Sequence, residues 1–183
     1  MQRVLKYLVL GTALLALALL GLGFALPDTA RITRSTEIQA PPETVFALLN
    51  GFSRFNEWSP WAQLDPGTRY RIEGPESGEG ARHLWESDNP SVGSGSQEII
   101  ESQLPRRIVI QLIFSGFDSD NLSIYELEPL ADGQATRLHW IYETDVKGSL
   151  MGRYFLLALD GLIGADYERG LARLKALLER PPG

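Results

Sequence analysis

The feature that most constrains this chain is a run of twenty residues without a formal charge, from Tyr7 to Leu26 (YLVLGTALLALALLGLGFAL). At about 1.5 Å of rise per residue such a run reaches about 30 Å as a helix, which matches the hydrocarbon core of a bilayer. A core helix of a soluble protein normally has a polar face, and this run offers only Tyr7 and Thr12 for one. We therefore expect residues 1–29 to form a membrane anchor, with a transmembrane helix over about residues 7–26, and residues 30–183 to form a folded domain.

Charges on both sides of the run bear on its orientation. Arg3 and Lys6 precede it, and the positive-inside tendency holds these cations in the cytoplasm, although Arg31 and Arg34 on the other side weaken the bias. A cleaved signal peptide is the alternative, because Gly23-Phe24-Ala25 offers a small-x-small site, but the apolar stretch exceeds the roughly 7–15 residues usual for such a region. We expect an uncleaved, single-pass signal anchor in the cytoplasmic membrane and an extracytoplasmic C-terminal domain, periplasmic if the source is bacterial.

Composition excludes several classes of function. The net charge of −6 does not suit a nucleic-acid binder, which must neutralise phosphates. The absence of cysteine excludes disulfides, thiolate metal sites and a cysteine nucleophile, and two histidines, His83 and His139, are too few for a histidine-rich metal centre. We expect no metal and no cofactor, since no phosphate loop, dinucleotide fingerprint or metal-ligand spacing is present.

Strand and helix patterns follow the apolar run. Residues 31–39 alternate in polarity and predict an edge-like first strand. Pro41-Pro42-Glu43 predicts a helix start, with Val45, Phe46 and Leu49 as its buried stripe, and residues 53–58 predict a second helical turn. Six further β segments are predicted at residues 68–74, 80–87, 94–102, 106–114, 121–129 and 135–145. Their short, turn-rich connections indicate an antiparallel meander with one buried face.

Residues 149–180 predict a helix interrupted at Gly161, Gly164 and Gly170. Its last part carries an apolar stripe at steps of four, three and four, formed by Tyr167, Leu171, Leu174 and Leu178. A curved sheet with one apolar face needs a cover, and this stripe is the element large enough to provide it.

The order of these elements resembles the START/polyketide-cyclase-like (SRPBCC) superfamily, and most of all its bacterial members of unassigned activity. The matching stretches are IQAPPETVFALLNGFSRFNEWSPW (38–61), GEGARHLWES (78–87), VGSGSQEIIES (92–102), ATRLHWIYETD (135–145) and GADYERGLARLKALL (164–178). The resemblance implies an α+β helix-grip fold, in which a curved antiparallel sheet wraps around the long C-terminal helix. It also implies a cavity for a hydrophobic or amphipathic small molecule between the two. The family has no universal catalytic motif, so the resemblance implies a pocket and not a reaction.

Aromatic residues on the predicted strands and helices are the candidates for lining that cavity. His83 shares strand parity with Trp85 and would face the cavity with it, but the favoured interpretation is a solvent-facing or hydrogen-bonded structural histidine. Trp58 and Trp61 either line the mouth or plug the small helices onto the sheet, and His139 is predicted on the wet face. The C-terminal helix is expected to supply the facing wall through Tyr154, Phe155, Leu162 and Tyr167. The ligand-binding candidates are Trp58, Trp61, His83, Trp85, Phe114, Tyr125, Trp140, Tyr142, Tyr154, Phe155 and Tyr167.

No catalytic constellation stands out, although Glu86, Asp145 or His83 offers an acid or base in principle. Three functions remain open. The leading hypothesis is a membrane-tethered domain that binds a hydrophobic or lipid-like small molecule. The alternatives are a cyclase, dehydratase or isomerase that uses an acid or base in the cavity, and an envelope interaction protein with a filled core.

Overall fold

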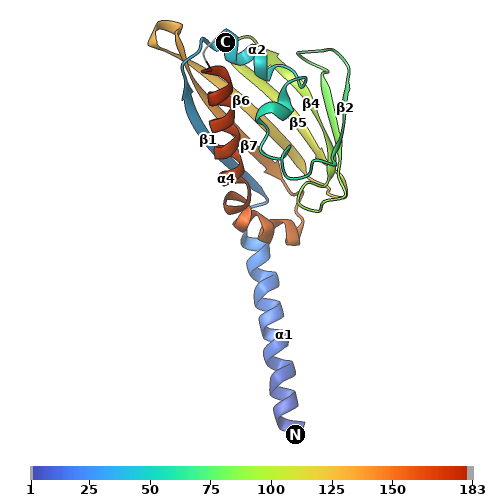
Figure 1. The fold of residues 1–183 in the computed structure, drawn as a ribbon. Coiled ribbons are helices and arrows are strands. Elements are labelled where there is room, and N and C mark those ends of the chain that lie inside the picture. The colour runs from blue at the N-terminus through green and yellow to red at the C-terminus, as the bar shows by residue number, and fades with distance from the viewer. Residues whose placement is uncertain (1, 181–183) are drawn as a thin grey trace.

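The computed structural model describes residues 2–180, so residue 1 of the predicted anchor and residues 181–183 of the predicted folded domain lie outside the described part. An N-terminal helix stands apart from a sheet that is covered on one face by three helices (Figure 1). The helices are α1 (Gln2–Ala25), α2 (Pro42–Leu49), α3 (Phe55–Trp58) and α4 (Leu150–Leu178), with a 3-10 turn at Ala131–Gly133. The strands are β1 (Thr29–Ile38), β2 (Arg69–Glu73), β3 (Arg82–Glu86), β4 (Ser94–Gln103), β5 (Arg107–Phe114), β6 (Asp120–Leu130) and β7 (Ala135–Asp145).

The seven strands form one antiparallel sheet in the order β1-β7-β6-β5-β4-β3-β2. The predicted meander and the edge position of the first strand are therefore confirmed. β7 lies between β1 and β6, with Thr29 opposite Asp145 and Ile38 opposite Thr136 at the two ends of the β1 pairing. A bulge between Ile99 and Glu101 shifts the register of β4 on β5, and bulges of this kind bend a sheet.

Alternating polarity decides which face of the sheet forms the core. On β7, Leu138 and Trp140 are almost completely buried, whereas His139 between them is partly exposed, as predicted. The opposite face carries ion pairs, for example Arg137 with Glu37 and Glu128, around a small apolar cluster of Val109, Ile124 and Ile141. One face of the sheet thus packs against helices and the other faces solvent.

The helices on the buried face begin and pack as their sequences indicate. α2 has Pro42 in its first turn and buries Val45, Phe46 and Leu49. α4 is capped at its N-terminus by Ser149, whose hydroxyl accepts a hydrogen bond from the Gly152 N–H at 3.1 Å.

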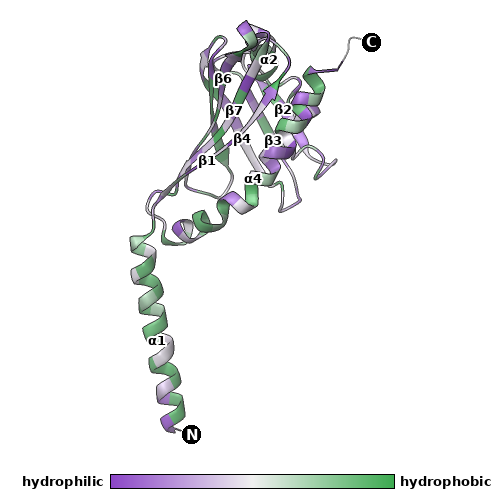
Figure 2. Cartoon of the chain, turned by 90° about the vertical axis from the view of Figure 1, so that its left-hand side faces the viewer, coloured by the Kyte–Doolittle hydropathy of each residue, from purple (hydrophilic) through white to green (hydrophobic). Residues whose placement is uncertain are grey.

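The expected interruptions of α4 are wrong, because Leu150–Leu178 is one hydrogen-bonded helix. A Cβ atom on Gly164 would lie 2.3 Å from the Arg34 guanidinium, and one on Gly170 would lie 2.7 Å from the Trp140 ring. These glycines therefore permit close packing of α4 on the sheet rather than breaking the helix. Figures 1 and 2 show that the helix bends, with its first turns near the end of α1 and the rest along the sheet.

α1 is long and apolar enough to cross a membrane, by length and composition, and within residues 2–180 it is the one helix of this kind. Its apolar surface is apparent in Figure 2, and Gly23 is its one buried residue.

Candidate functional site

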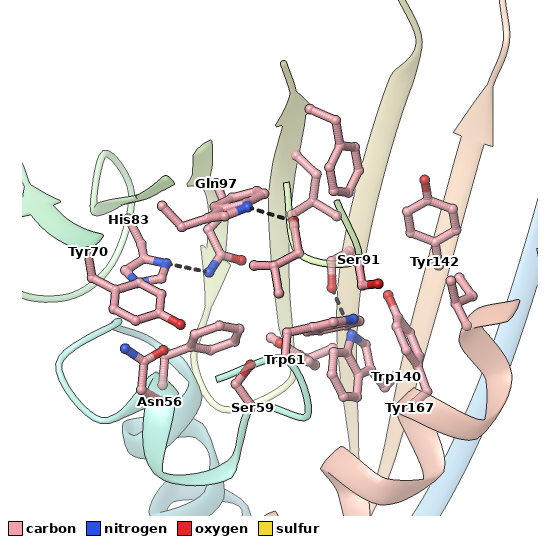
Figure 3. Close-up of a pocket in the computed structure, with 18 residues that line it drawn as sticks. Asn56, Ser59, Trp61, Tyr70, His83, Ser91, Gln97, Trp140, Tyr142 and Tyr167 are labelled. Atoms are coloured by element: carbon pink, nitrogen blue, oxygen red, sulfur yellow. Dashed lines mark hydrogen bonds between the residues drawn. The ribbon is translucent and has the colours of Figure 1, made fainter. Parts of the chain in front are cut away.

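A cavity of about 210 Å³ lies between the buried face of the sheet, the α3 region and α4 (Figure 3). Its wall is mostly aromatic and aliphatic, with a few amide and hydroxyl groups. The lining residues are Phe55, Asn56, Ser59, Trp61, Tyr70, His83, Trp85, Ser91, Val92, Gln97, Leu112, Phe114, Ser123, Tyr125, Trp140, Tyr142, Ile163 and Tyr167.

Most of the candidate cavity residues are brought together here, although they come from elements far apart in the sequence. Those on the wall are Trp61, His83, Trp85, Phe114, Tyr125, Trp140, Tyr142 and Tyr167. Three of the candidates, Trp58, Tyr154 and Phe155, lie elsewhere.

Trp58 packs behind the cavity wall, which is the plugging role weighed above. Its side chain is only 1% exposed and meets Phe55, Tyr125 and Trp140 edge to face. Because the indole fills the space between α3 and the sheet, it supports the wall without reaching the cavity. Trp61, on the following loop, does reach it and packs against Trp140 and Tyr167.

The expectation that Tyr154 and Phe155 form the facing wall is wrong. The Tyr154 hydroxyl donates a hydrogen bond to the backbone carbonyl of Leu19 in α1, and Phe155 is 53% exposed. The first turns of α4 lie beyond the sheet, so α4 contributes to the cavity only through Ile163 and Tyr167. Leu162, expected with them, is exposed.

His83 is the most unusual polar group on the wall. It is 2% exposed and lies between the rings of Phe52 and Tyr70, both nearly parallel to the imidazole. Its Nδ1 lies 3.0 Å from Nε2 of Gln97, which donates the hydrogen bond and leaves the imidazole proton on Nε2 (Figure 3). Burial lowers the pKa of His83 from 6.5 to about 4. The ring is therefore neutral at physiological pH and acts as a hydrogen-bonding group.

A second cluster of rings closes the other side of the cavity. Trp140 stacks on Tyr167 with the ring centres 3.9 Å apart, and its Nε1 donates a hydrogen bond to the Ser123 hydroxyl at 2.8 Å. Burial raises the pKa of Tyr125 and of Tyr167, so both phenols remain protonated and uncharged.

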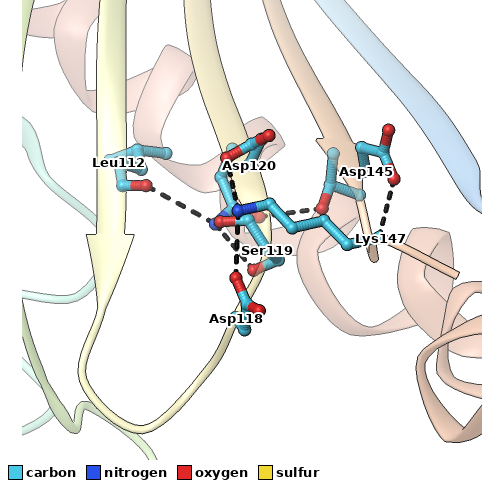
Figure 4. Close-up of polar contacts among 8 residues, drawn as sticks. Leu112, Asp118, Ser119, Asp120, Asp145 and Lys147 are labelled. Atoms are coloured by element: carbon cyan, nitrogen blue, oxygen red, sulfur yellow. Dashed lines mark hydrogen bonds and ion pairs between the residues drawn. The ribbon is translucent and has the colours of Figure 1, made fainter. Parts of the chain in front are cut away.

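Tyr142 is held at the same side by the polar groups of the β5–β6 connection. Its hydroxyl and that of Thr144 each donate to Oδ1 of Asn121 at 2.8 Å. Asn121 in turn donates to Ser119, and Lys147 pairs with Asp118 and Asp120 beside it (Figure 4). This network orients Tyr142 without placing a charge on the cavity wall.

No carboxylate, lysine or arginine lines the cavity within residues 2–180. Glu86 instead pairs with Arg69, and the Asp145 carboxylate accepts a hydrogen bond from the Lys147 backbone N–H. The two carboxylates considered as acids or bases therefore lie outside the cavity. The described residues also contain no group of three or more histidine and carboxylate side chains placed to hold a metal.

Several wall residues were not foreseen from the sequence, among them Asn56, Tyr70 and Gln97. The register of two hairpins places the last two: Gln97 lies opposite His83 on β4, and Tyr70 lies opposite Trp85 on β2. Once the pairing is known, strand parity puts the side chains of Tyr70, His83, Trp85 and Gln97 on one face of the sheet. The sequence signal was therefore present, but reading it required the strand register.

Comparisons with known proteins agree with this architecture. A family model described as polyketide cyclase / dehydrase and lipid transport matches residues 29–179. No curated protein matches the sequence.

Solved structures share the fold at low sequence identity. The Zhui aromatase/cyclase from Streptomyces sp. R1128 superposes with a TM-score of 0.62 at 13% identity, over 83% of this chain and 94% of that one. Truncated norcoclaurine synthase from Thalictrum flavum gives 0.61 at 15% identity, over 84% and 96%. A protein from Thermobifida fusca gives 0.57 at 20% identity, over 84% and 97%.

Proposed function

This chain belongs to the polyketide cyclase/dehydrase and lipid transport family, and on that premise we propose that it is a membrane-tethered domain that binds a hydrophobic small molecule in the cavity between its sheet and α4. The observation that carries the proposal is an aromatic cavity whose wall, within residues 2–180, has no formally charged side chain at neutral pH. Such a wall favours an uncharged apolar ligand, because transferring a charge into it would cost several kcal/mol or more without a partner.

The size of the cavity limits the ligand. An apolar cavity of about 150 Å³ accepts benzene, so about 210 Å³ suits one or two rings, or the end of an acyl or isoprenoid chain, rather than a whole phospholipid. The stacked and edge-on rings of Trp61, Trp140 and Tyr167 would grip a flat or chain-like apolar group.

Four of the polar side chains on the cavity wall lie at one side and would orient the ligand. His83, Gln97, Asn56 and Tyr70 lie together in Figure 3, away from Trp140 and Tyr167. The Nε2–H of neutral His83 is a donor that suits a carbonyl or hydroxyl oxygen. The ligand would therefore be an apolar molecule with one uncharged polar end.

Catalysis by a cyclase, dehydratase or isomerase is the second candidate function. His83 is the residue on the cavity wall that could act as its acid or base. A general base works best when its pKa is near the operating pH, and the pKa of His83 is lowered to about 4. With the carboxylates outside the cavity, binding has the stronger support. The open cavity also favours a binding role over an interaction protein with a filled core.

The proposal includes the membrane anchor and the side of the membrane on which the folded domain lies. The uncharged run of residues 7–26, preceded by Arg3 and Lys6 in the first turns of α1, supports an uncleaved anchor with the folded domain of residues 30–183 outside the cytoplasm. A ligand that partitions into the adjacent bilayer would then be within reach of the cavity.

Native mass spectrometry of the full chain in detergent tests the binding proposal, with two matched variants. Leu112→Trp fills the cavity from β5, whereas Ile113→Trp adds the same ring to the opposite, exposed face of that strand. We expect a bound molecule on the wild type and on Ile113→Trp, and its loss from Leu112→Trp. Lipid bound nonspecifically to α1 would remain on all three proteins.

Two outcomes would contradict the proposal. One is a wild type that carries no ligand and takes up none after incubation with a membrane lipid extract. The other is equal retention of the ligand by both tryptophan variants while circular dichroism shows both to be folded. Multiple turnover of a ligand, abolished by His83→Gln, would favour the enzyme instead.

A further inference from the structure

The end of α1 and the first turns of α4 lie side by side in this structure (Figures 1 and 2). Gly23 is buried against Leu150 and Tyr154, where a Cβ atom would lie 2.3 Å from the Leu150 side chain. The Tyr154 hydroxyl donates to the Leu19 carbonyl, more than one turn before the end of α1. The first turn of α4 therefore packs alongside the last turns of α1 rather than beyond its end.

Arg153 fixes this arrangement. Its guanidinium donates to the backbone carbonyls of Phe24 at 3.0 Å and Leu26 at 3.1 Å, and pairs with Asp28 at 3.3 Å. These carbonyls have no partner within α1, and the negative end of a helix dipole attracts a cation. Arg153, the one charged residue among the first ten residues of α4, therefore binds the C-terminal end of α1.

The contact with Leu19 sets the depth of α4 relative to the proposed membrane span. Leu19 lies seven residues before Leu26, the last residue of the uncharged run, which is about 10 Å along a helix axis. If the run fills the hydrocarbon core, the Tyr154 hydroxyl at the Leu19 carbonyl lies about 10 Å inside the outer boundary of that core. The Arg153 guanidinium, at the carbonyls of Phe24 and Leu26, lies at the boundary itself.

The first turns of α4 also carry an apolar stripe on their exposed side. Met151, Phe155, Ala158 and Leu162 follow the helical spacing i, i+4, i+7 and i+11, and all four are exposed. Met151 is 79% exposed and Phe155 53%. The later turns of α4 instead expose charged residues such as Glu168 and Arg169. An exposed apolar surface of this kind marks a contact with a membrane or with another molecule. The stripe lies next to the face of α4 that contacts α1.

We propose that this interfacial stripe, Met151, Phe155, Ala158 and Leu162, is a membrane-docking surface that lies in the outer leaflet of the bilayer crossed by α1. The inference rests on the tether of the proposed function. Continuity with α1 identifies the occupant as lipid, because the Arg153 and Leu19 contacts hold the first turns of α4 between the headgroup boundary and a depth of about 10 Å inside it, where interfacial helices bury their apolar faces. The residue after Leu162 is Ile163, which lines the cavity, so one side of α4 would contact lipid where the other contacts the ligand.

The cysteine-free sequence permits a direct test in the full chain. The single-cysteine variants Met151→Cys and Phe155→Cys are labelled with the environment-sensitive fluorophore NBD. Leu14→Cys serves as a probe of α1, and Glu168→Cys as an exposed site on the later turns of α4. Each protein is placed, one copy per nanodisc, in phosphatidylcholine with or without doxyl-labelled lipid. We expect blue-shifted emission and a loss of fluorescence with doxyl lipid at Met151, Phe155 and Leu14, and neither at Glu168.

The controls separate this inference from the tether. Quenching at Leu14 without quenching at Met151 and Phe155 would overturn the docking surface and leave the tether intact. Absence of quenching at Leu14 as well would refute the tether and, with it, the docking surface. Emission that is blue-shifted at Phe155 only when two copies share a disc would assign the stripe to a second copy and also overturn the inference. The labelled sites are exposed, so near-wild-type circular dichroism is expected and verifies folding.

Discussion

Protonation of His83 provides a quantitative test of the site. The imidazole is buried between Phe52 and Tyr70 and accepts a hydrogen bond from Gln97 at Nδ1, an arrangement that requires the neutral ring. Burial lowers its pKa from 6.5 to about 4 in the folded protein, whereas the ordinary value returns on unfolding. Between these two pH values the unfolded chain binds more protons, so acidification destabilises the fold. The fold has its full stability with respect to His83 above pH 6.5, and the free energy of unfolding decreases as the pH falls from 6.5 towards 4.

The magnitude follows from the two pKa values. From pH 7 to pH 5, linkage through this one group lowers the free energy of unfolding by about 2 kcal/mol, because one pKa unit corresponds to about 1.4 kcal/mol. A protonated His83 would also repel an apolar ligand from the cavity, since the charge would have to be buried with it. Ligand binding should therefore weaken over the same pH range.

Urea unfolding of the full chain in detergent, followed by tryptophan fluorescence at pH 7 and pH 5, measures the effect. We expect the wild type to lose about 2 kcal/mol more stability between these pH values than His83→Gln, which has no titrating group at this position. Equal losses for the wild type and His83→Gln would refute the claim that a buried, neutral His83 is part of the cavity wall.

Further predictions concern the packing around the cavity. Gly170→Ala should destabilise the domain, because the new methyl group would lie 2.7 Å from the Trp140 ring, whereas Gly161→Ala, which meets nothing within 4 Å, should gain about 0.5–1 kcal/mol from helix propensity. Thermal unfolding compares the pair, and equal effects would show that α4 does not depend on close approach at Gly170. Ser123→Ala should cost about 1–3 kcal/mol in urea unfolding, since it leaves the buried Trp140 N–H without its acceptor; an unchanged midpoint would mean that the N–H finds another partner.

The local patterns of the sequence predict most of the fold. Successive residues of a strand point to opposite faces, so the alternation of Leu138 and Trp140 with His139 shows from neighbouring residues alone which face of the strand is buried. The same holds for the start of α2 at Pro42 and for the buried stripe that includes Tyr167 and Leu171 on α4. These elements lie where the sequence predicts them, apart from small differences at their ends.

The candidate site was predictable only in part: Asn56, Tyr70 and Gln97 were missed, and the residues wrongly placed on the wall lie on α4. Aromatic residues on strands could be assigned to the cavity side by parity. Tyr154 and Phe155 could not, because a helix presents residues all around its axis, and the partner of each side depends on where the helix lies in space. A glycine in the sequence likewise does not show whether it breaks a helix or, as at Gly170, admits a ring from the sheet.

By itself, the sequence determined an apolar helix, an antiparallel meander and a covering C-terminal helix, because each depends on the periodicity of nearby residues. Only the tertiary structure decided that about 210 Å³ remains open beneath α4, that His83 meets Gln97 across two strands, and that the start of α4 packs against α1. These features arise from contacts between residues distant in the chain. Such contacts depend on the shapes of facing surfaces, which no local pattern encodes.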